Sequence, residues 1–278
     1  MAFAAALVAA LACISLSGCS MVGEDYQPEL KSPELEPPAI GQEDTLRVGV
    51  NTSNSPLAGV SGDKIIGIDV DVAGAIGDAL GLKVDLRDVG SDGQVAIDSG
   101  NVDIVLGIDS DSSEKGMWIS SEYIPTGMVV FALESSDKQA PKAGDNVKIG
   151  AQISSKSAWA ITNSFGEKTL VSESDLATAF QALEAGEVDY VASDAIVGLY
   201  AANRQNVDVK MVGVIGATSG YCVMASKNNT ELSSAISETI SGIVDDGVMD
   251  VIERKWLNND VELKDLAKID AKKGSNSQ

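Results

Sequence analysis

The chain has 278 residues, of which 41 are acidic and 20 basic, so its formal net charge is -21. Like charge would repel nucleic acid and a bare anionic bilayer, which argues against both as partners of the folded body. Histidine is absent, which removes the commonest general base and metal ligand, and with them zinc hydrolases and Ser-His-Asp enzymes. The length is sufficient for one or two lobes that each bury a core.

The chain begins with an uncharged apolar run from Ala2 to Leu16, which has the length of a signal-peptide core and is too short for a membrane span. It ends in Leu16-Ser17-Gly18-Cys19, which resembles the bacterial lipoprotein signal, cut before a cysteine that then carries the lipid. Residues 1–18 are therefore predicted to be a lipoprotein signal peptide. We expect lipid on Cys19 to anchor the protein to the extracytoplasmic face of the cell membrane.

Residues 19–44 hold four of the seven prolines of the chain and few apolar residues. Such composition predicts an extended, semi-rigid tether that does not pack against the folded body. At the other end, residues 258–278 are predicted to be a polar C-terminal tail.

Between Thr45 and Leu257, short apolar runs alternate with helical periodicity, a pattern typical of strand-helix units around mostly parallel sheets. The first half predicts a helix at Asp71–Leu80, closed by Gly81. Its predicted strands are Leu46–Val50, Leu82–Leu86 and Val102–Leu106.

The second half repeats this scheme. A helix is predicted from about Ser157, and another from Ser174 to Ala185, with Ser174 as its cap and Gly186 at its end. The strands predicted here are Val147–Ala151 and Val188–Ala192, and two last helices follow, one capped by Asn229 and one at Val248–Leu257.

Several segments in order carry a family resemblance: Leu46 to Val50, Gly67-Ile68-Asp69-Val70-Asp71, Ser120 to Tyr123, Val188 to Asp194, and Gly247 to Leu257. Together they resemble the type II periplasmic binding proteins of the polar amino-acid class. The resemblance implies an α/β fold with two lobes, each a mostly parallel sheet flanked by helices. It implies lobe 1 from residues 45–131 plus 222–257, lobe 2 from 132–221, and a hinge of two strands, Val129–Leu133 and Gly220–Ala225.

Ligands of parallel sheets bind beyond the carboxyl ends of the strands, so the polar residues that follow the predicted strands are the candidates. These ligand-binding candidates are Asn51, Ser53, Asp109, Ser155, Ser157 and Asp194. In the family, the acid at the position of Asp194 pairs with a ligand ammonium. Asp194 could equally cap the helix that follows it, because Asp is a favoured N-cap. Ser155 and Ser157 stand at a helix start, where they either bind a ligand carboxylate or simply cap the helix.

Lys115 stands where the resembling family has a carboxylate-binding Arg, and Asp109 stands where it has Thr. Lys offers a point charge and no bidentate fork. If Lys115 faces the site, an amino acid remains the expected ligand, with weaker recognition of its carboxylate. If it does not, Asp109 and Asp194 form an acidic pocket suited to an amine.

Four aromatic residues could line a pocket, but large aromatic side chains are mostly buried in the core. They are Trp118, Tyr123, Trp159 and Tyr221. The single cysteine of the folded body, Cys222, lies in an apolar run, so we expect a buried, inert thiol and no internal disulfide.

The resemblance implies a monomeric, extracytoplasmic solute-binding lipoprotein that captures a small polar ligand, an amino acid or amine, for the permease of an ABC importer. No cofactor, metal or catalytic residue is expected. Two alternatives remain: a sensor or adhesin that feeds no transporter, and a dehydratase-like enzyme on the same fold. The absence of His and of a nucleophile-base pair argues against the enzyme.

Overall fold

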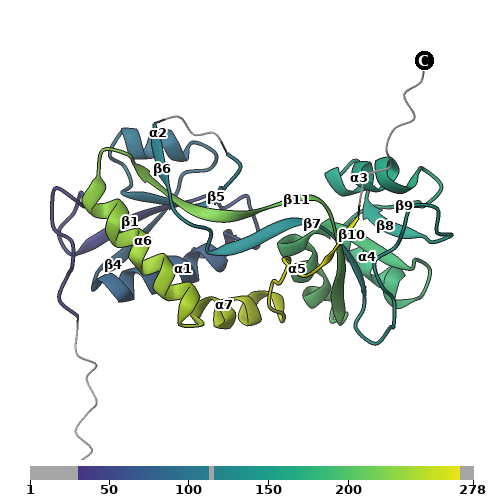
Figure 1. Cartoon of the computed structure of the whole chain (residues 1–278). Helices are drawn as coiled ribbons and strands as arrows, with labels where there is room; N and C mark the ends of the chain where they lie inside the picture. Colours follow the sequence, from purple (N-terminus) through teal and green to yellow (C-terminus); the bar gives the residue numbers. More distant parts are fainter. Residues whose placement is uncertain (1–30, 113–115, 270–278) are drawn as a thin grey trace, which may run out of the picture. The chain divides into compact units, whose positions relative to one another are not determined.

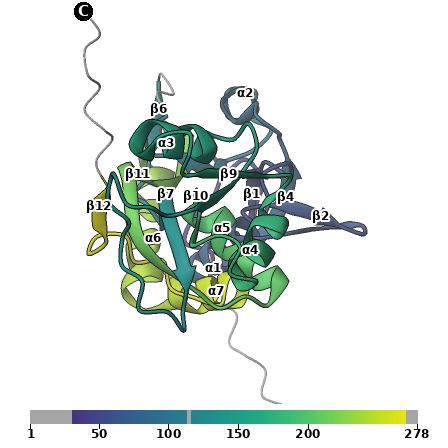
Figure 2. The same cartoon turned by 90° about the vertical axis from the view of Figure 1, so that its right-hand side faces the viewer.

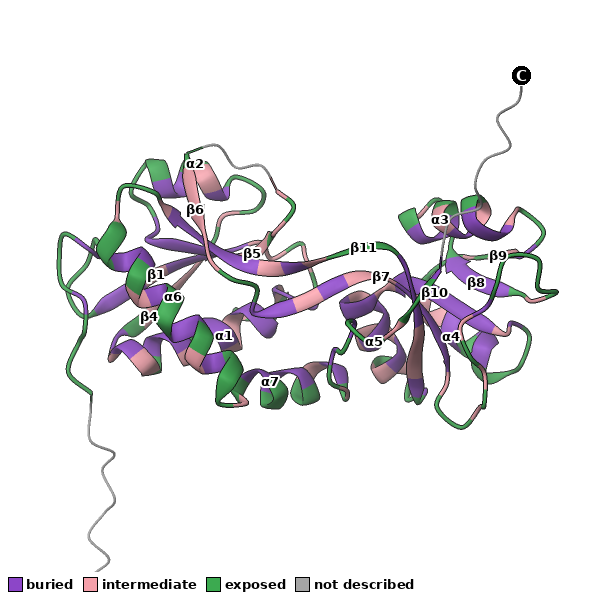
Figure 3. Ribbon diagram, viewed as in Figure 1, coloured by how far each residue is buried: buried purple, intermediate pink, exposed green. Residues whose placement is uncertain are grey.

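The structure is a computed structural model, and it describes residues 31–112 and 116–269. The chain folds as two α/β lobes that share one sheet, with the strand order β4-β1-β5-β11-β7-β10-β8-β9 (Figure 1). Its two long strands, β7 (Ile124–Leu133) and β11 (Val209–Ser226), pair antiparallel and run through both lobes. The buried residues of the sheet lie mainly in its inner strands, whereas the helices expose their outer faces (Figure 3).

Lobe 1 is built on β1 (Thr45–Val50), which pairs parallel with β4 (Lys83–Asp88) and β5 (Ile104–Asp109). Helix α1 (Ile68–Leu80) buries Val72, Ala73, Ile76 and Leu80 along one face and ends at Gly81, which adopts the left-handed conformation. The other elements of this lobe are β2 (Gly59–Ser61), β3 (Lys64–Ile66), α2 (Gly93–Asp98), β6 (Met117–Ile119), α6 (Thr230–Asp245) and α7 (Val248–Leu257).

Lobe 2 is built on β10 (Tyr190–Asp194), which pairs antiparallel with β7 and parallel with β8 (Ile149–Gln152). Strand β9 (Leu170–Glu173) extends the sheet beyond β8. The helices of this lobe are α3 (Lys156–Phe165), α4 (Leu176–Glu184) and α5 (Ala195–Gln205) (Figure 2). Phe131 of β7 meets Phe180 of α4 edge to face, with ring centroids 5.6 Å apart, which joins sheet and helix in one core.

The predicted strands and helices are confirmed with shifts of one to three residues at their ends. Asn229 caps α6 as predicted, since its Oδ1 accepts a hydrogen bond from the backbone N–H of Leu232 at 3.2 Å. The predicted cap of α4 was wrong by one residue. Asp175, and not Ser174, accepts the hydrogen bond from the backbone N–H of Thr178 at 2.8 Å, because a carboxylate in extended conformation precedes the first turn.

The described part of the predicted tether, residues 32–44, packs against lobe 1, so the expectation that this segment does not pack was wrong. Leu35, Ala39 and Ile40 are buried among its prolines and join the main hydrophobic cluster. Asn229 donates a hydrogen bond to the Ala39 carbonyl at 2.8 Å. Three apolar side chains and this hydrogen bond therefore attach a segment whose average composition is polar.

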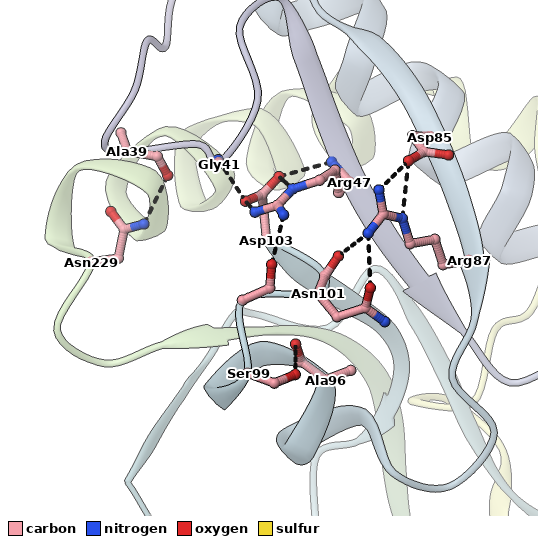
Figure 4. A network of polar contacts seen from close by, with 11 residues as sticks. Ala39, Gly41, Arg47, Asp85, Arg87, Ala96, Ser99, Asn101, Asp103 and Asn229 are labelled. Carbon is pink, nitrogen blue, oxygen red and sulfur yellow. Dashed lines mark hydrogen bonds and ion pairs between the residues drawn. The ribbon is translucent and has the colours of Figure 1, made fainter.

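Asp103, directly before β5, ties this segment to the sheet (Figure 4). Its carboxylate accepts hydrogen bonds from the backbone N–H of Gly41 at 2.9 Å and from the backbone N–H of Arg47 at 2.9 Å. The Arg47 guanidinium adds two more, from Nε at 3.1 Å and Nη2 at 2.6 Å. Both carboxylate oxygens of this nearly buried side chain are thus fully used.

The predicted polar tail is also part of the fold as far as residue 269. Val261, Leu263 and Ile269 are buried, and β12 (Ala267–Ile269) pairs parallel with β11. The predicted strands Val129–Leu133 and Gly220–Ala225 lie within β7 and β11, but they do not pair with each other, because Val129 pairs with Val214 and Gly220 with Pro125. Their role as a hinge stays a prediction.

Candidate functional site

A cavity of about 320 Å³ lies at the carboxyl ends of the lobe 1 strands. Because β1 and β5 run parallel, the residues that follow them meet at the same edge of the sheet. Asn51 comes from the end of β1, Gly107 to Asp109 from the end of β5, and residues 90–95 from the loop after β4 and the start of α2. Of the predicted site residues, the cavity brings together Asn51 and Asp109.

The loop after β1 is ordered by Asp88, at the end of β4. Asp88 accepts hydrogen bonds from the Thr52 hydroxyl at 2.5 Å and from the Gly90 backbone N–H at 3.1 Å, and these bonds hold the pKa of its carboxyl below the usual range. Asn51 Oδ1 accepts the backbone N–H of Ser53 at 3.1 Å. Ser53 is exposed in this turn and does not line the cavity, so its role is to shape the loop.

Asp109 lies on the cavity wall, exposed to solvent. Its Oδ1 accepts a hydrogen bond from the backbone N–H of Asp111 at 3.0 Å. In the antiparallel pairing of β5 with β11, Asp109 lies opposite Tyr221. Ser112 Oγ, which lines the same cavity, is the only buried side-chain oxygen or nitrogen without a hydrogen-bond partner in the described part of the chain. Ser112 was not among the predicted site residues, because nothing in its spacing along the sequence sets it apart. Lys115 lies outside the described residues.

Asp194 is the last residue of β10 and the N-cap of α5. Helix capping was one of its two predicted roles. Oδ1 accepts the backbone N–H groups of Ile196 at 3.0 Å and Val197 at 3.2 Å. Oδ2 accepts the hydroxyl of Thr126, on β7, at 2.7 Å. Burial raises the pKa of this carboxyl, its hydrogen bonds lower it, and the charge of Asp109 raises it further.

Tyr221 of β11 lies in the electrostatic field of both carboxylates. Burial raises the pKa of its phenol, and the negative charges of Asp194 and Asp109 raise it further. Two carboxylates that come from different lobes therefore act on one half-buried hydroxyl. Such an arrangement attracts a cationic group to this edge of the sheet.

The predicted serines cap α3 within lobe 2. Ser155 Oγ accepts the backbone N–H of Ala158 at 3.1 Å and donates to the Gln152 carbonyl at 2.6 Å. It also lies 2.7 Å from the hydroxyl oxygen of Ser157, which is buried. These contacts fit the capping alternative, and neither serine lines the cavity of lobe 1.

A buried chain of hydrogen bonds holds Gly107, which lines the cavity, in place. The Tyr123 hydroxyl donates to Asp69 Oδ1 at 2.6 Å and accepts the backbone N–H of Gly107 at 3.0 Å. Asp69 is only 1% exposed, and burial raises the pKa of its carboxyl to about 7 despite the Tyr123 bond, which lowers it. Gly107 has a φ of +75°, and a Cβ there would lie 2.6 Å from Asp69 Oδ2, so only glycine fits at this wall.

The predictions for the aromatic residues and the cysteine had mixed outcomes. Tyr123 is buried as expected, and Trp118 and Tyr221 pack partly against the core. Trp159 of α3 was predicted to be core, but it is 72% exposed. Cys222 is buried and unpaired as predicted, and burial raises the pKa of its thiol to about 12, which keeps it protonated and inert.

Neither a cluster of metal ligands nor a membrane-spanning helix is found among the described residues. In residues 31–112 and 116–269, no group of three or more His, Cys, Asp or Glu side chains gathers as metal ligands would. Among the helices of the same residues, none is both long enough and apolar enough to cross a membrane.

Known proteins resemble this chain in sequence and in fold. The ABC transporter glutamine-binding protein GlnH of Bacillus subtilis (strain 168) is 26% identical over 93% of this chain and 97% of its own length. The L-cystine-binding protein TcyJ of Escherichia coli (strain K12) is 24% identical over 80% of this chain and 86% of its own length.

Among solved structures, the fold matches the unliganded open form of the L-cystine solute receptor of Neisseria gonorrhoeae with a TM-score of 0.64. The two chains are 23% identical, and the match covers 79% of this chain and 95% of the receptor. It also matches a polar amino acid ABC uptake transporter substrate-binding protein of Streptococcus thermophilus, with a TM-score of 0.69, 22% identity and coverage of 78% and 88%. Residues 46–259 match the model of one protein family over most of the chain. The chain belongs to the bacterial extracellular solute-binding proteins, family 3.

Proposed function

We propose that this protein captures a small polar solute, an amino acid or an amine, between its two lobes and delivers it to the permease of an ABC importer. The observation that carries the proposal is the position of Asp109 and Asp194 at strand ends of different lobes, with both charges acting on Tyr221. The relatives named as glutamine-binding and L-cystine-binding proteins support an amino-acid ligand. The lobes are proposed to be formed by residues 45–131 plus 222–257, and by residues 132–221, with residues 32–44 packed against the first and residues 258–269 against both.

Asp194 is the proposed partner of the ligand ammonium. A carboxylate offers about four acceptor positions, and three of those of Asp194 are taken by Ile196, Val197 and Thr126. One position remains for a donor from the ligand. An ammonium there would favour the ionised form of Asp194, because a cation offsets the unfavourable burial and the charge of Asp109.

Asp109 decides between the two classes of ligand. A carboxylate at the cavity wall repels the carboxylate of an amino acid, unless Lys115 or another cation compensates. An amine carries no such group and meets two attractive charges. The two ligand classes are distinguished by comparing the affinity for an amino acid with the affinity for the corresponding decarboxylated amine, at equal ionic strength.

The experiment is a calorimetric or thermal-shift titration of the full chain, with Cys19→Ser to prevent lipidation, against amino acids and amines. A ligand that binds only the folded state raises the melting temperature. Asp194→Asn keeps an oxygen that can cap α5, but it removes the charge and puts an NH2 group where Oδ2 accepts the Thr126 hydroxyl. A charge-assisted hydrogen bond is worth about 1.5–3 kcal/mol, so Asp194→Asn should weaken binding by about 10- to 150-fold.

The matched control is Asp175→Asn, which changes the equivalent cap of α4 away from the site. It should leave the affinity unchanged. An unaltered affinity in Asp194→Asn would remove the ammonium role. Absence of binding for every amino acid and amine tested would overturn the proposed ligand class.

We also propose that the protein is extracytoplasmic, monomeric and anchored by lipid on Cys19. The support is the Leu16-Ser17-Gly18-Cys19 box and the extracellular location of the family. Cys19 lies outside the described residues. Mass spectrometry of the membrane fraction should find diacylglycerol on this cysteine, and Cys19→Ser should release the protein into solution.

We propose a binding role and not an enzymatic one, although an ancestral cyclohexadienyl dehydratase matches the fold with a TM-score of 0.61 and 19% identity. The support is that the chain contains no histidine and that its candidate site gathers carboxylates without a nucleophile-base pair. Consumption of prephenate or arogenate by the purified protein would contradict this proposal.

A further inference from the structure

Residues 258–269 form a segment that we call the strap. It starts at the end of α7, which is fixed to lobe 1. Trp256 Nε1 donates to Asp71 Oδ2 at 2.6 Å, and Lys255 forms an ion pair with the same carboxylate at 2.6 Å. Asp71 lies in the first turn of α1, so α7 is fixed to lobe 1. The start of the strap already meets lobe 2, because Asn259 Nδ2 donates to the Val209 carbonyl at 3.3 Å and Asn203 Nδ2 of α5 donates to the Trp256 carbonyl at 3.2 Å.

The middle of the strap, residues 260–264, contacts lobe 1. Val261 and Leu263 are buried in the main hydrophobic cluster. The backbone N–H of Val261 donates to Glu253 Oε2 of α7 at 2.7 Å, a carboxylate that is only 6% exposed. Residues 260–264 also line a cavity together with Pro125, Thr218 and Ser219 of the two long strands.

The last part of the strap belongs to lobe 2. Strand β12 pairs parallel with residues 213–215 of β11, the stretch of β11 that pairs with residues 128–130 of β7. Ile269 is buried in the lobe 2 cluster with Ile149, Ile161 and Phe165. A Cβ on Gly213 would lie 2.7 Å from Ile269 Cδ1, so the glycine makes room for this side chain.

Between these two attachments lies the point where the long strands lose regular pairing. The register of β11 against β7 shifts between Ile215 and Thr218, and Gly216 has a φ of +82°. Pairing of β11 with β5 begins only at Tyr221. The strap is thus attached to lobe 2 just before the irregularity and to lobe 1 beyond it, so any bend at residues 216–220 must also move the strap.

We propose that the strap is a third connection between the lobes and that it limits the range of motion at the hinge. Two paired strands can bend where their pairing is irregular. A third segment that is hydrogen-bonded to one lobe and buried in the other opposes that bend, because its ends cannot separate without breaking β12 or exposing Ile269. The strap also covers the side of β11 that would be an open sheet edge in lobe 2.

The test is single-molecule energy transfer between dyes on the two lobes of the full chain, without ligand. Cysteines at the exposed positions Glu238 of α6 and Lys168, before β9, accept the dyes. Cys13→Ser and Cys19→Ser remove the two leader thiols, and the buried Cys222 does not react. Ile269→Asn should release β12 and broaden the distribution of inter-lobe distances. Lys268→Asn, an exposed change in the same strand, should leave it unaltered.

Amide hydrogen exchange of residues 213–215 reports release of β12 in the same samples. If Ile269→Asn leaves β12 paired, deletion of residues 266–278 still removes this strand. The deletion should also broaden the distribution of inter-lobe distances. An unchanged distribution in the deletion variant would overturn the proposal. The measurement needs no ligand, so its failure is separate from a failure of the proposed solute-binding function.

Discussion

Asp69→Asn should change how the stability of the protein depends on pH. The Asp69 carboxyl is buried beneath the cavity wall, and its pKa is about 7 in the folded protein against an ordinary value of 3.8. A raised pKa means that folding favours the protonated form. The stability that this group contributes is therefore complete below pH 3.8 and is lost as the pH rises through 7.

The magnitude follows from the size of the shift. About three pKa units correspond to roughly 4 kcal/mol across the whole window, of which roughly 2 to 3 kcal/mol falls between pH 5 and pH 8. The side chain is almost fully buried, so solvent does not screen this energy. Asparagine carries no charge, and its Oδ1 can still accept the Tyr123 hydroxyl. Any loss of stability from placing its amide beside Gly107 does not depend on pH.

The assay is urea unfolding of the wild type and Asp69→Asn at pH 5 and pH 8. The free energy of unfolding of the wild type should fall relative to that of the variant by roughly 2 to 3 kcal/mol between the two pH values. Glu253, whose pKa burial also raises to about 7, contributes equally to both proteins and cancels in the difference. Equal pH dependence of the two proteins would refute the reasoning.

Two further predictions test the packing of the lobes. Asp103→Asn should lower the free energy of unfolding by about 3 kcal/mol in urea unfolding, because it leaves Arg47 and the Gly41 N–H with weakened partners. Asp85→Asn, which removes an exposed partner of Arg87, should cost less than about 1 kcal/mol, and an equal loss in both would contradict this account. Phe180→Ala should cost about 3–5 kcal/mol by leaving a cavity against Phe131, whereas Trp159→Ser should change stability by no more than about 0.5 kcal/mol. Thermal unfolding of both variants checks this contrast, which fails if the exposed Trp159 proves the costlier loss.

Local sequence patterns were sufficient for the elements and for part of the site. Apolar periodicity located β1, β10 and α1, and capping residues such as Gly81 and Asn229 marked helix ends within a few residues. The rule that ligands bind beyond parallel strand ends selected Asn51 and Asp109, which line one cavity. These features depend on backbone geometry and on neighbours close in sequence, so the sequence alone determined them.

Only the tertiary structure decided which residues outside these patterns pack, and where. Leu35, Ile40 and Ile269 are isolated apolar residues in polar segments, and their burial depends on surfaces that distant strands and helices provide. The same holds for Trp159, whose helix turns it outward, and for Asp69, whose pKa depends on Tyr123 and Gly107 from other parts of the chain. Periodicity describes a residue's neighbours along the chain, whereas burial and electrostatic field are set by neighbours in space.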